Sequence, residues 1–99
     1  MGRTSPTGLL RYQTGAVYFG QMLNFERHGV GKLINIDGSY FEGTFEKDKL
    51  FGKNCKIYDD ITGDYYIGNM DNDKKSGIGM YYINHTNSIY EGEFINDRM

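Results

Sequence analysis

The sequence predicts an all-β fold, in which consecutive β-hairpins form one elongated, twisted antiparallel sheet. Three observations predict it: a repeat of 23 to 25 residues, alternation of large side chains within each repeat, and turn signals between repeats. No window of the chain has the 3.6-residue period of an amphipathic helix. Short strands that follow one another this closely are most simply paired as hairpins, one hairpin per repeat.

An aromatic-x-glycine marker defines the repeat. The marker glycines follow one another at steps of 23, 25 and 24 residues, a large residue comes two positions after each, and a further glycine comes nine positions after the first three. This fixed spacing beside a variable one is typical of structural units joined by turns. The repeat-defining residues are Tyr18, Gly20, Met22, Gly29 and Gly31; Phe41, Gly43, Phe45 and Gly52; Tyr66, Gly68, Met70, Gly77 and Gly79; and Tyr90, Gly92 and Phe94.

The repeat divides the chain into units. We expect a half unit at 8–14, full units at 15–37, 38–62 and 63–86, and a half unit at 87–99. Residues 1–7 precede the pattern and are expected to be a flexible N-terminus or a cloning remnant. Because the pattern begins and ends within a unit, we expect the chain to be cut from a longer array.

Each unit is expected to hold two strands. In the first unit, Val17–Leu23 alternates its large residues between two faces and predicts the first strand. The polar segment 24–28 is the expected connection, and 31–36 the second strand. Asp37-Gly38 is a turn signal that leads to the next unit.

The glycines have a mechanical explanation. A marker glycine between two large residues leaves a gap in which a neighbouring ring can lie. The later pair, Gly29 and Gly31, predicts a sharp or positive-φ backbone. Asn54 takes the second glycine position of the next unit, and asparagine is the usual substitute at left-handed positions.

The bulk composition excludes several classes of protein. A net charge of −2 with mixed signs is no footprint for DNA or RNA, and no apolar run approaches membrane-spanning length. A single cysteine, Cys55, allows no internal disulfide and fits a reducing, cytoplasmic location.

Four motifs could suggest chemistry, and each has a simpler explanation. The stretch Gly29-Val30-Gly31-Lys32 is not followed by the helix that a phosphate loop requires. A calcium loop that begins at 71–73 would have Lys75 at its fifth position, where a ligand is needed, and Ser76 at its sixth, where glycine is needed. His28 and His85 have no metal-ligand spacing, and Cys55 has no activating partner. We expect no catalytic residue, no cofactor and no metal.

The repeated markers resemble the MORN (membrane occupation and recognition nexus) repeat over roughly residues 8–99. Met22, Met70 and Asn54 depart from the pattern, as does the longer turn at 58–62. The resemblance implies an elongated sheet whose hairpins stack only on their neighbours. It also implies a scaffold at membrane-associated cytoskeleton, or an accessory module beside catalytic domains such as phosphoinositide kinases and lysine methyltransferases.

The expected function is a non-enzymatic scaffold that binds protein partners or a second copy through its aromatic face and sheet edges. A single sheet has two faces and no helix is available to cover one, so some aromatic surface should stay accessible. The expected interface residues are Tyr90, Phe94, Tyr18 and Tyr66. The alternative is membrane targeting, with weak contacts to phospholipid from Lys47, Lys49, Lys53 and Lys56.

Overall fold

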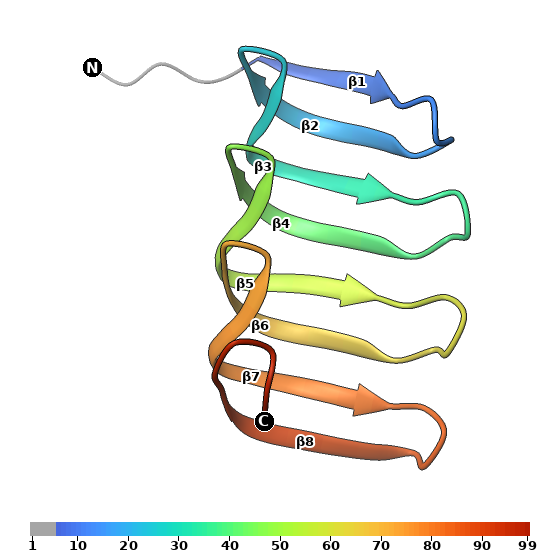
Figure 1. Ribbon diagram of the computed structural model, residues 1–99, viewed down its shortest axis with the longest axis vertical. Helices are drawn as coiled ribbons and strands as arrows, with labels where there is room; N and C mark the ends of the chain where they lie inside the picture. Colours follow the sequence, from blue (N-terminus) through green and yellow to red (C-terminus); the bar gives the residue numbers. More distant parts are fainter. Residues whose placement is uncertain (1–5) are drawn as a thin grey trace.

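The computed structural model describes residues 6–99 as one open sheet whose eight antiparallel strands follow sequence order (Figure 1). The described residues contain no helix. The predicted all-β sheet of consecutive hairpins is therefore confirmed. The strands are β1 Thr7–Arg11, β2 Val17–Leu23, β3 Glu26–Ile34, β4 Tyr40–Glu46, β5 Lys49–Tyr58, β6 Tyr65–Asp71, β7 Lys74–Ile83 and β8 Ser88–Phe94.

The predicted N-terminal segment is only partly described. Residues 1–5 lie outside the described part of the chain, and Thr7 already belongs to β1. The Pro6 carbonyl accepts a hydrogen bond from the Met22 amide, so the pairing with β2 extends to this residue.

Two-residue turns connect the strands along one side of the sheet. Both turn residues have positive φ at Asn24–Phe25, Lys47–Asp48 and Asn72–Asp73, and the same turn recurs at Asn96–Asp97 after β8. This geometry is the type I′ turn, whose twist matches that of paired strands. The predicted connection 24–28 was too long, because β3 already begins at Glu26.

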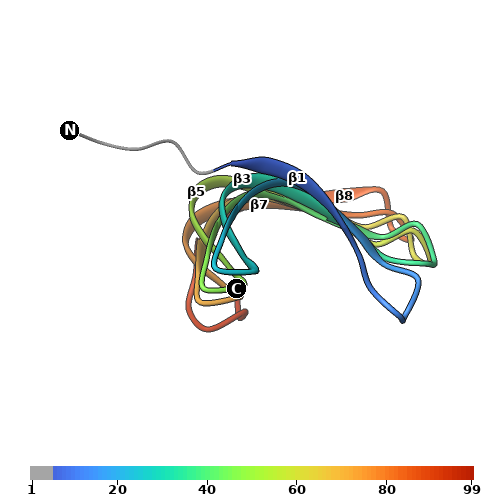
Figure 2. The same cartoon turned by 90° about the horizontal axis from the view of Figure 1, so that it is seen from above.

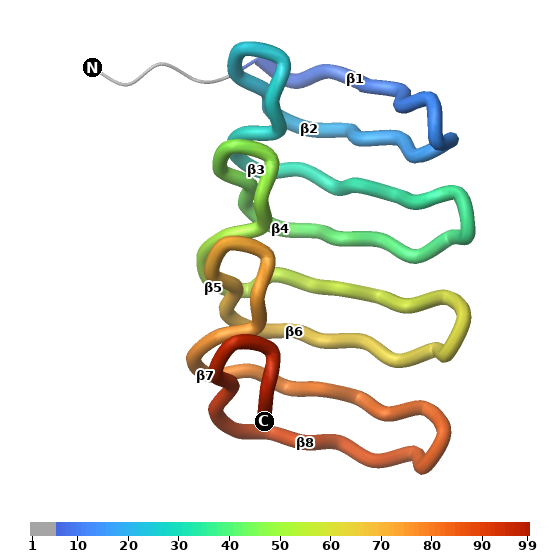
Figure 3. Tube along the Cα trace, in the orientation of Figure 1, coloured from blue at the N-terminus to red at the C-terminus, as the bar shows by residue number. Residues whose placement is uncertain are grey.

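The sheet is long and arched. It measures 42 × 32 × 16 Å, and the hairpins follow one another along its long axis (Figure 3). The view along that axis shows the hairpins lying nearly over one another with one end bent under (Figure 2). The bend follows register shifts, such as that between Gly20 and Met22, where two additional residues on β3 raise the local curvature. Gly29 has a φ of 101° beside this bend, so the predicted positive-φ backbone is confirmed there.

A row of glycines runs across all eight strands with one interruption. It consists of Gly8, Gly20, Gly31, Gly43, Cys55, Gly68, Gly79 and Gly92. Gly31 does not have the predicted positive φ, and neither does Gly79, which holds the same place in the third unit. These two glycines are required by close approach, because a Cβ on either would overlap the ring of Tyr18 or Tyr66.

The middle unit fills this row differently. β4 and β5 shift register by one residue more than the neighbouring hairpins, so that Cys55, not Asn54, lies beside Gly43. Asn54 is the additional residue and has a φ of 59°. Its predicted left-handed backbone is therefore correct, whereas its alignment with Gly31 was wrong by one position.

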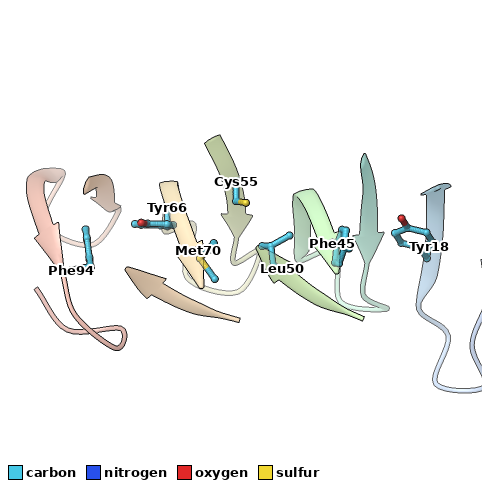
Figure 4. Close-up of a cluster of buried hydrophobic side chains, with 7 residues drawn as sticks. All are labelled: Tyr18, Phe45, Leu50, Cys55, Tyr66, Met70 and Phe94. Carbon is cyan, nitrogen blue, oxygen red and sulfur yellow. The ribbon is translucent and has the colours of Figure 1, made fainter. Parts of the chain in front are cut away.

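The core is a line of buried side chains inside the arch (Figure 4). Rings of successive repeats touch edge to face, with centroid distances of 5.4 Å for Tyr18 and Phe45 and 5.0 Å for Tyr66 and Phe94. Each hairpin therefore buries its aromatic residue against the next hairpin, as in a repeat array. The core members are Tyr18, Phe45, Leu50, Cys55, Tyr66, Met70 and Phe94.

Aspartates at the hairpin turns attach each repeat to the preceding one. Asp48 Oδ1 accepts a hydrogen bond from the Arg27 amide, Asp73 Oδ1 from the Leu50 amide, and Asp97 Oδ1 from the Lys75 amide, each at 2.8 Å. The Asp amides donate in return to the carbonyls of the same three residues. The turn of one hairpin is thereby fixed to the strand before it.

Candidate interaction surfaces

The concave face contains a hollow at the middle hairpin. Its volume is about 290 Å³, and the apolar part of its wall comes from Leu33, Phe41, Phe45, Leu50, Ile57 and Met70. Arg27, Asp48 and Asp73 form the polar part. In the neighbouring hairpins a tyrosine hydroxyl reaches over the glycine row, as Tyr66 does over Gly79. Phe41 has no hydroxyl, which leaves the middle of the concave face less filled.

The polar groups around this hollow are already engaged. Arg27 donates to the Tyr12 hydroxyl and to the Asp48 carbonyl, both at 2.7 Å, and its guanidinium lies over the rings of Tyr12 and Phe45. Asp48 and Asp73 accept backbone amides. Only Arg27 Nε is buried without a hydrogen-bond partner, and it lies 3.8 Å from Asp48 Oδ1. These polar groups therefore hold successive hairpins together.

The opposite, convex face presents two equivalent groups of side chains, which we call the lysine–tyrosine clusters. The first cluster is Lys32, Tyr40 and Tyr58, and the second is Lys56, Tyr65 and Tyr82. In each cluster, the lysine lies against the ring of a tyrosine on the next strand. That ring in turn stacks on a tyrosine of the strand after it. The two clusters are therefore related by the shift of one hairpin along the sheet.

The contacts within the first cluster are close. Lys32 Nζ lies 4.0 Å from the centroid of the Tyr40 ring, and the rings of Tyr40 and Tyr58 are 5.3 Å apart. Such distances are those of a cation–π contact and of aromatic stacking. Tyr58 also donates to Asp60 Oδ1 at 3.1 Å, and this hydrogen bond raises the pKa of Tyr58.

The second cluster repeats this arrangement. Lys56 Nζ lies 5.6 Å from the ring centroids of both Tyr40 and Tyr65, and the rings of Tyr65 and Tyr82 are stacked at 5.0 Å. A hydrogen bond with Tyr40 raises the pKa of Lys56. No ion pair to Lys32 or Lys56 occurs among residues 6–99. Glu42 is the cross-strand neighbour of both lysines but forms an ion pair with neither.

Three of the four predicted interface residues lie in the core. Tyr18, Tyr66 and Phe94 are 0 to 2% exposed, and Tyr90 is half-buried with its ring 5.3 Å from that of Phe94. The tyrosine rings of the convex clusters are half-buried and were not among the predicted interface residues. The most exposed rings are those of Phe25 and Phe19. The doublets Tyr65-Tyr66 and Tyr81-Tyr82 carried the signal, because neighbouring strand residues point to opposite faces.

The four predicted lipid-contacting lysines do not form one patch. Lys49 Nζ lies 3.9 Å from Asp73 Oδ2, and Lys56 belongs to the second cluster. Lys47 lies at a hairpin turn, and Lys53 is exposed in the middle of β5. The positive charge is thus distributed over different parts of one hairpin.

The described residues contain neither a metal-binding cluster nor a membrane-spanning helix. Residues 6–99 hold no group of three or more His, Cys, Asp or Glu side chains placed to bind a metal. In the same part of the chain, no helix is long and apolar enough to cross a membrane. Cys55 is fully buried, and burial raises the pKa of its thiol. The thiol donates to the Phe51 carbonyl at 3.4 Å, which fits a structural role.

Comparison with known families agrees with this geometry. The family model described as "MORN repeat" matches residues 18–40, 66–85 and 90–99. The chain belongs to the MORN repeat family. MORN repeats are in general interaction and membrane-association modules, and the repeat itself is non-catalytic. The MORN markers correspond to the ring-over-glycine packing of the first and third hairpins.

The curated relatives include alsin from rat (Rattus norvegicus), mouse (Mus musculus) and human (Homo sapiens). Each is 32% identical over 104 residues, which covers 99% of this chain and 6% of the relative. The chain therefore spans a small part of the length of these relatives.

Proposed function

We propose that this MORN array is a non-enzymatic module that binds a protein partner through the convex lysine–tyrosine clusters. One observation carries the proposal: two pairs of stacked tyrosines, each with a lysine that forms no ion pair, lie on a sheet face that no second layer covers within residues 6–99. Tyrosine provides a large, rigid contact area and a polar end, which makes it common at the centre of protein interfaces.

The concave face supports this assignment by contrast. Its rings pack between repeats, and its charges are bound to backbone groups. Binding there would compete with contacts that hold the array together. The convex clusters can be covered without loss of any core contact.

The test is selection of peptides from a displayed random library, followed by calorimetry. Selected peptides should bind the protein and should bind the variant Tyr58→Ser/Tyr82→Ser at least about tenfold more weakly, as expected for interface aromatic anchors. The control is Ile78→Ser, because Ile78 is 62% exposed and lies outside both clusters. Equal loss in the control, or unchanged affinity in the cluster variant, would reject the proposal.

The alternative function is targeting to membrane phospholipid, either alone or as an accessory module of a larger protein such as a phosphoinositide kinase or a lysine methyltransferase. Family membership and the exposed Lys47 and Lys53 favour it. Flotation with vesicles that contain phosphatidylserine tests it, and Lys47→Glu/Lys53→Glu should abolish flotation. Absence of flotation by the unchanged protein would remove this alternative.

The proposed location follows from either function. We place the protein in the cytoplasm, at the periphery of a membrane or cytoskeletal structure. Association of two copies through the sheet edges is a further arrangement for the same scaffold, since an unpaired strand edge offers free backbone groups. Light scattering over a concentration series measures it, and a constant monomer mass would argue against it.

A further inference from the structure

The spacing of the two clusters is a property that a ligand can match. They are related by one hairpin, which places them two strands apart, or about 9.4–9.8 Å at ordinary strand spacing. The hairpins lie nearly over one another along the long axis of the sheet (Figure 2). A straight, extended ligand that runs across the strands would therefore meet the same chemistry twice in succession.

A polyproline II helix has this repeat. It advances about 3.1 Å per residue with three residues per turn, so its side chains recur on one face every ~9.3 Å. Its backbone has no internal hydrogen bonds, which leaves its carbonyls free to accept from the hydroxyls of Tyr40 and Tyr65. The hydroxyls of Tyr58 and Tyr82 donate within the protein. A β-strand ligand fits less well, since its side chains recur on one face every two residues, or about 6.6 Å.

The rings offer surfaces that proline can use. Tyr58 and Tyr65 are directly paired across β5 and β6, yet each ring stacks on the other neighbour, Tyr40 or Tyr82. The stacked pairs are thus separate, and each presents an aromatic ridge to solvent. Proline-rich segments dock on surfaces lined by aromatic rings.

The charges of the clusters select among such segments. Lys32 and Lys56 each stand beside a ring, and neither is ion-paired within residues 6–99. Glu42 lies between them in the same row of the sheet, and Asp60 accepts a hydrogen bond from Tyr58 of the first cluster, so the two lysines are separate positive sites on a face of mixed charge. An acidic residue at every third position of the ligand would place a carboxylate near each lysine.

We propose that the ligand of the convex face is an acidic, proline-rich segment in the polyproline II conformation, which lies along the long axis of the sheet with one three-residue turn on each lysine–tyrosine cluster. This inference rests on the proposed function and names its ligand class. The lysine in each cluster favours an acidic residue over a basic one at the repeat distance, and the repeat favours polyproline II over a flexible chain.

The experiment compares three synthetic fifteen-residue peptides by calorimetry and by NMR shifts of the tyrosine rings. The probe is (Pro-Pro-Glu)5, the charge control is (Pro-Pro-Lys)5, and the conformation control is (Gly-Ser-Glu)5. The probe should bind at least about tenfold more tightly than either control, and its affinity should fall as salt rises, because the contact depends on partly exposed charges.

Variants then locate the contact. Lys32→Gln/Lys56→Gln and Tyr58→Ser/Tyr82→Ser should each weaken the probe at least about tenfold, and the lysine variant should lose most of the salt dependence. Lys53→Gln/Lys74→Gln removes the same charge from exposed positions outside the clusters and should bind as the unchanged protein does. Circular dichroism confirms that each variant is folded, which is expected because no cluster residue belongs to the core.

The outcomes separate the two proposals. If library-selected peptides require the clusters but (Pro-Pro-Glu)5 does not bind, the polyproline inference is overturned and the binding function stands. Equal binding of the three peptides, or undiminished binding by both cluster variants, also overturns the inference. If no peptide binds the clusters at all, both proposals fail.

Discussion

The middle hairpin and the hairpins on either side of it build the same place in the sheet from different residues. In the first and third units a tyrosine lies over a glycine and touches a phenylalanine of the following repeat. In the middle unit the corresponding residues are Phe41, Cys55 and Met70, and an additional residue, Asn54, restores the register. The volume removed with the hydroxyl is thus partly returned by a thiol. The comparison indicates that the aromatic residue and the residue beneath it in the glycine row vary together.

The largest expected effect tests whether the first and third units require glycine in the glycine row. Gly79→Ala should lower the free energy of unfolding by about 2–3 kcal/mol, because the new methyl would overlap the Tyr66 ring. Cys55→Ala is the matched variant, at a position that already holds a side chain, and should cost only about 1 kcal/mol. Urea denaturation followed by circular dichroism measures both. Similar costs would show that the row does not distinguish the units.

The next effect concerns the contact between units. Asp73→Ala removes the acceptor of the Leu50 amide and places alanine at a φ of 70°, so we expect a loss of about 2 kcal/mol. Asp73→Asn keeps a side-chain oxygen and tolerates this backbone, and should cost less than about 1 kcal/mol. Asp71→Ala serves as the control, since Asp71 is exposed and belongs to none of the turn contacts. An equally costly Asp71→Ala would contradict the role of the turn aspartate.

A smaller effect tests whether ring and row residue are coupled. Phe41→Tyr should cost about 1 kcal/mol, because the added hydroxyl would meet Cys55. The cost of Phe41→Tyr should be smaller when Cys55→Gly is also present, which a double-mutant cycle measures as an interaction energy. In the outer unit, Tyr66→Phe should cost about 1 kcal/mol through loss of the bond to the Asn69 carbonyl. Additive costs in the middle unit would mean that the two positions vary independently.

The smallest effect is a dependence on pH. Burial is the main cause that raises the pKa of Cys55, so the folded state holds the thiol proton more tightly than the unfolded state does. This stabilisation is complete below the unfolded pKa of about 8.5 and is lost as pH rises through the folded pKa. The urea concentration at the unfolding midpoint should therefore decrease as the pH rises from about 7.5 to about 9.5. The decrease should be smaller in Cys55→Ala. Burial raises the pKa of Tyr18 and Tyr66 in the same direction, with effects at higher pH.

Most of the fold could be predicted because the repeat fixes it. The marker spacing predicted the hairpins, and β2 coincides with the predicted strand Val17–Leu23. The start of β3 was missed because Asn24-Phe25 does not resemble a turn sequence, although the backbone forms the same turn as Asn72-Asp73. The position of Cys55 was also hidden. Counting residues aligns Asn54 with glycine, and only the strand pairing shows that Asn54 is additional.

The candidate site was less predictable than the fold. The repeat draws attention to residues that recur, and Tyr18 and Tyr66 recur because they pack in the core. The convex clusters occur in only two neighbouring hairpins, and aliphatic residues such as Val17 and Ile89 occupy their places elsewhere in the row. The repeat pattern marks only residues that recur in every unit, so it does not point to a ligand-binding surface that occurs in two units alone. It required the register to bring Lys56 beside Tyr65.

The turn aspartates give the array a polarity. In all three contacts the carboxylate belongs to the later hairpin and the backbone amide to the earlier one. Loss of one aspartate therefore loosens the boundary towards the N-terminus and leaves the boundary on the other side intact. The hydrogen-bond ladders of the sheet are nearly the same in both directions along its long axis. The aspartate contacts are not, because each hairpin supplies the carboxylate that binds the hairpin before it.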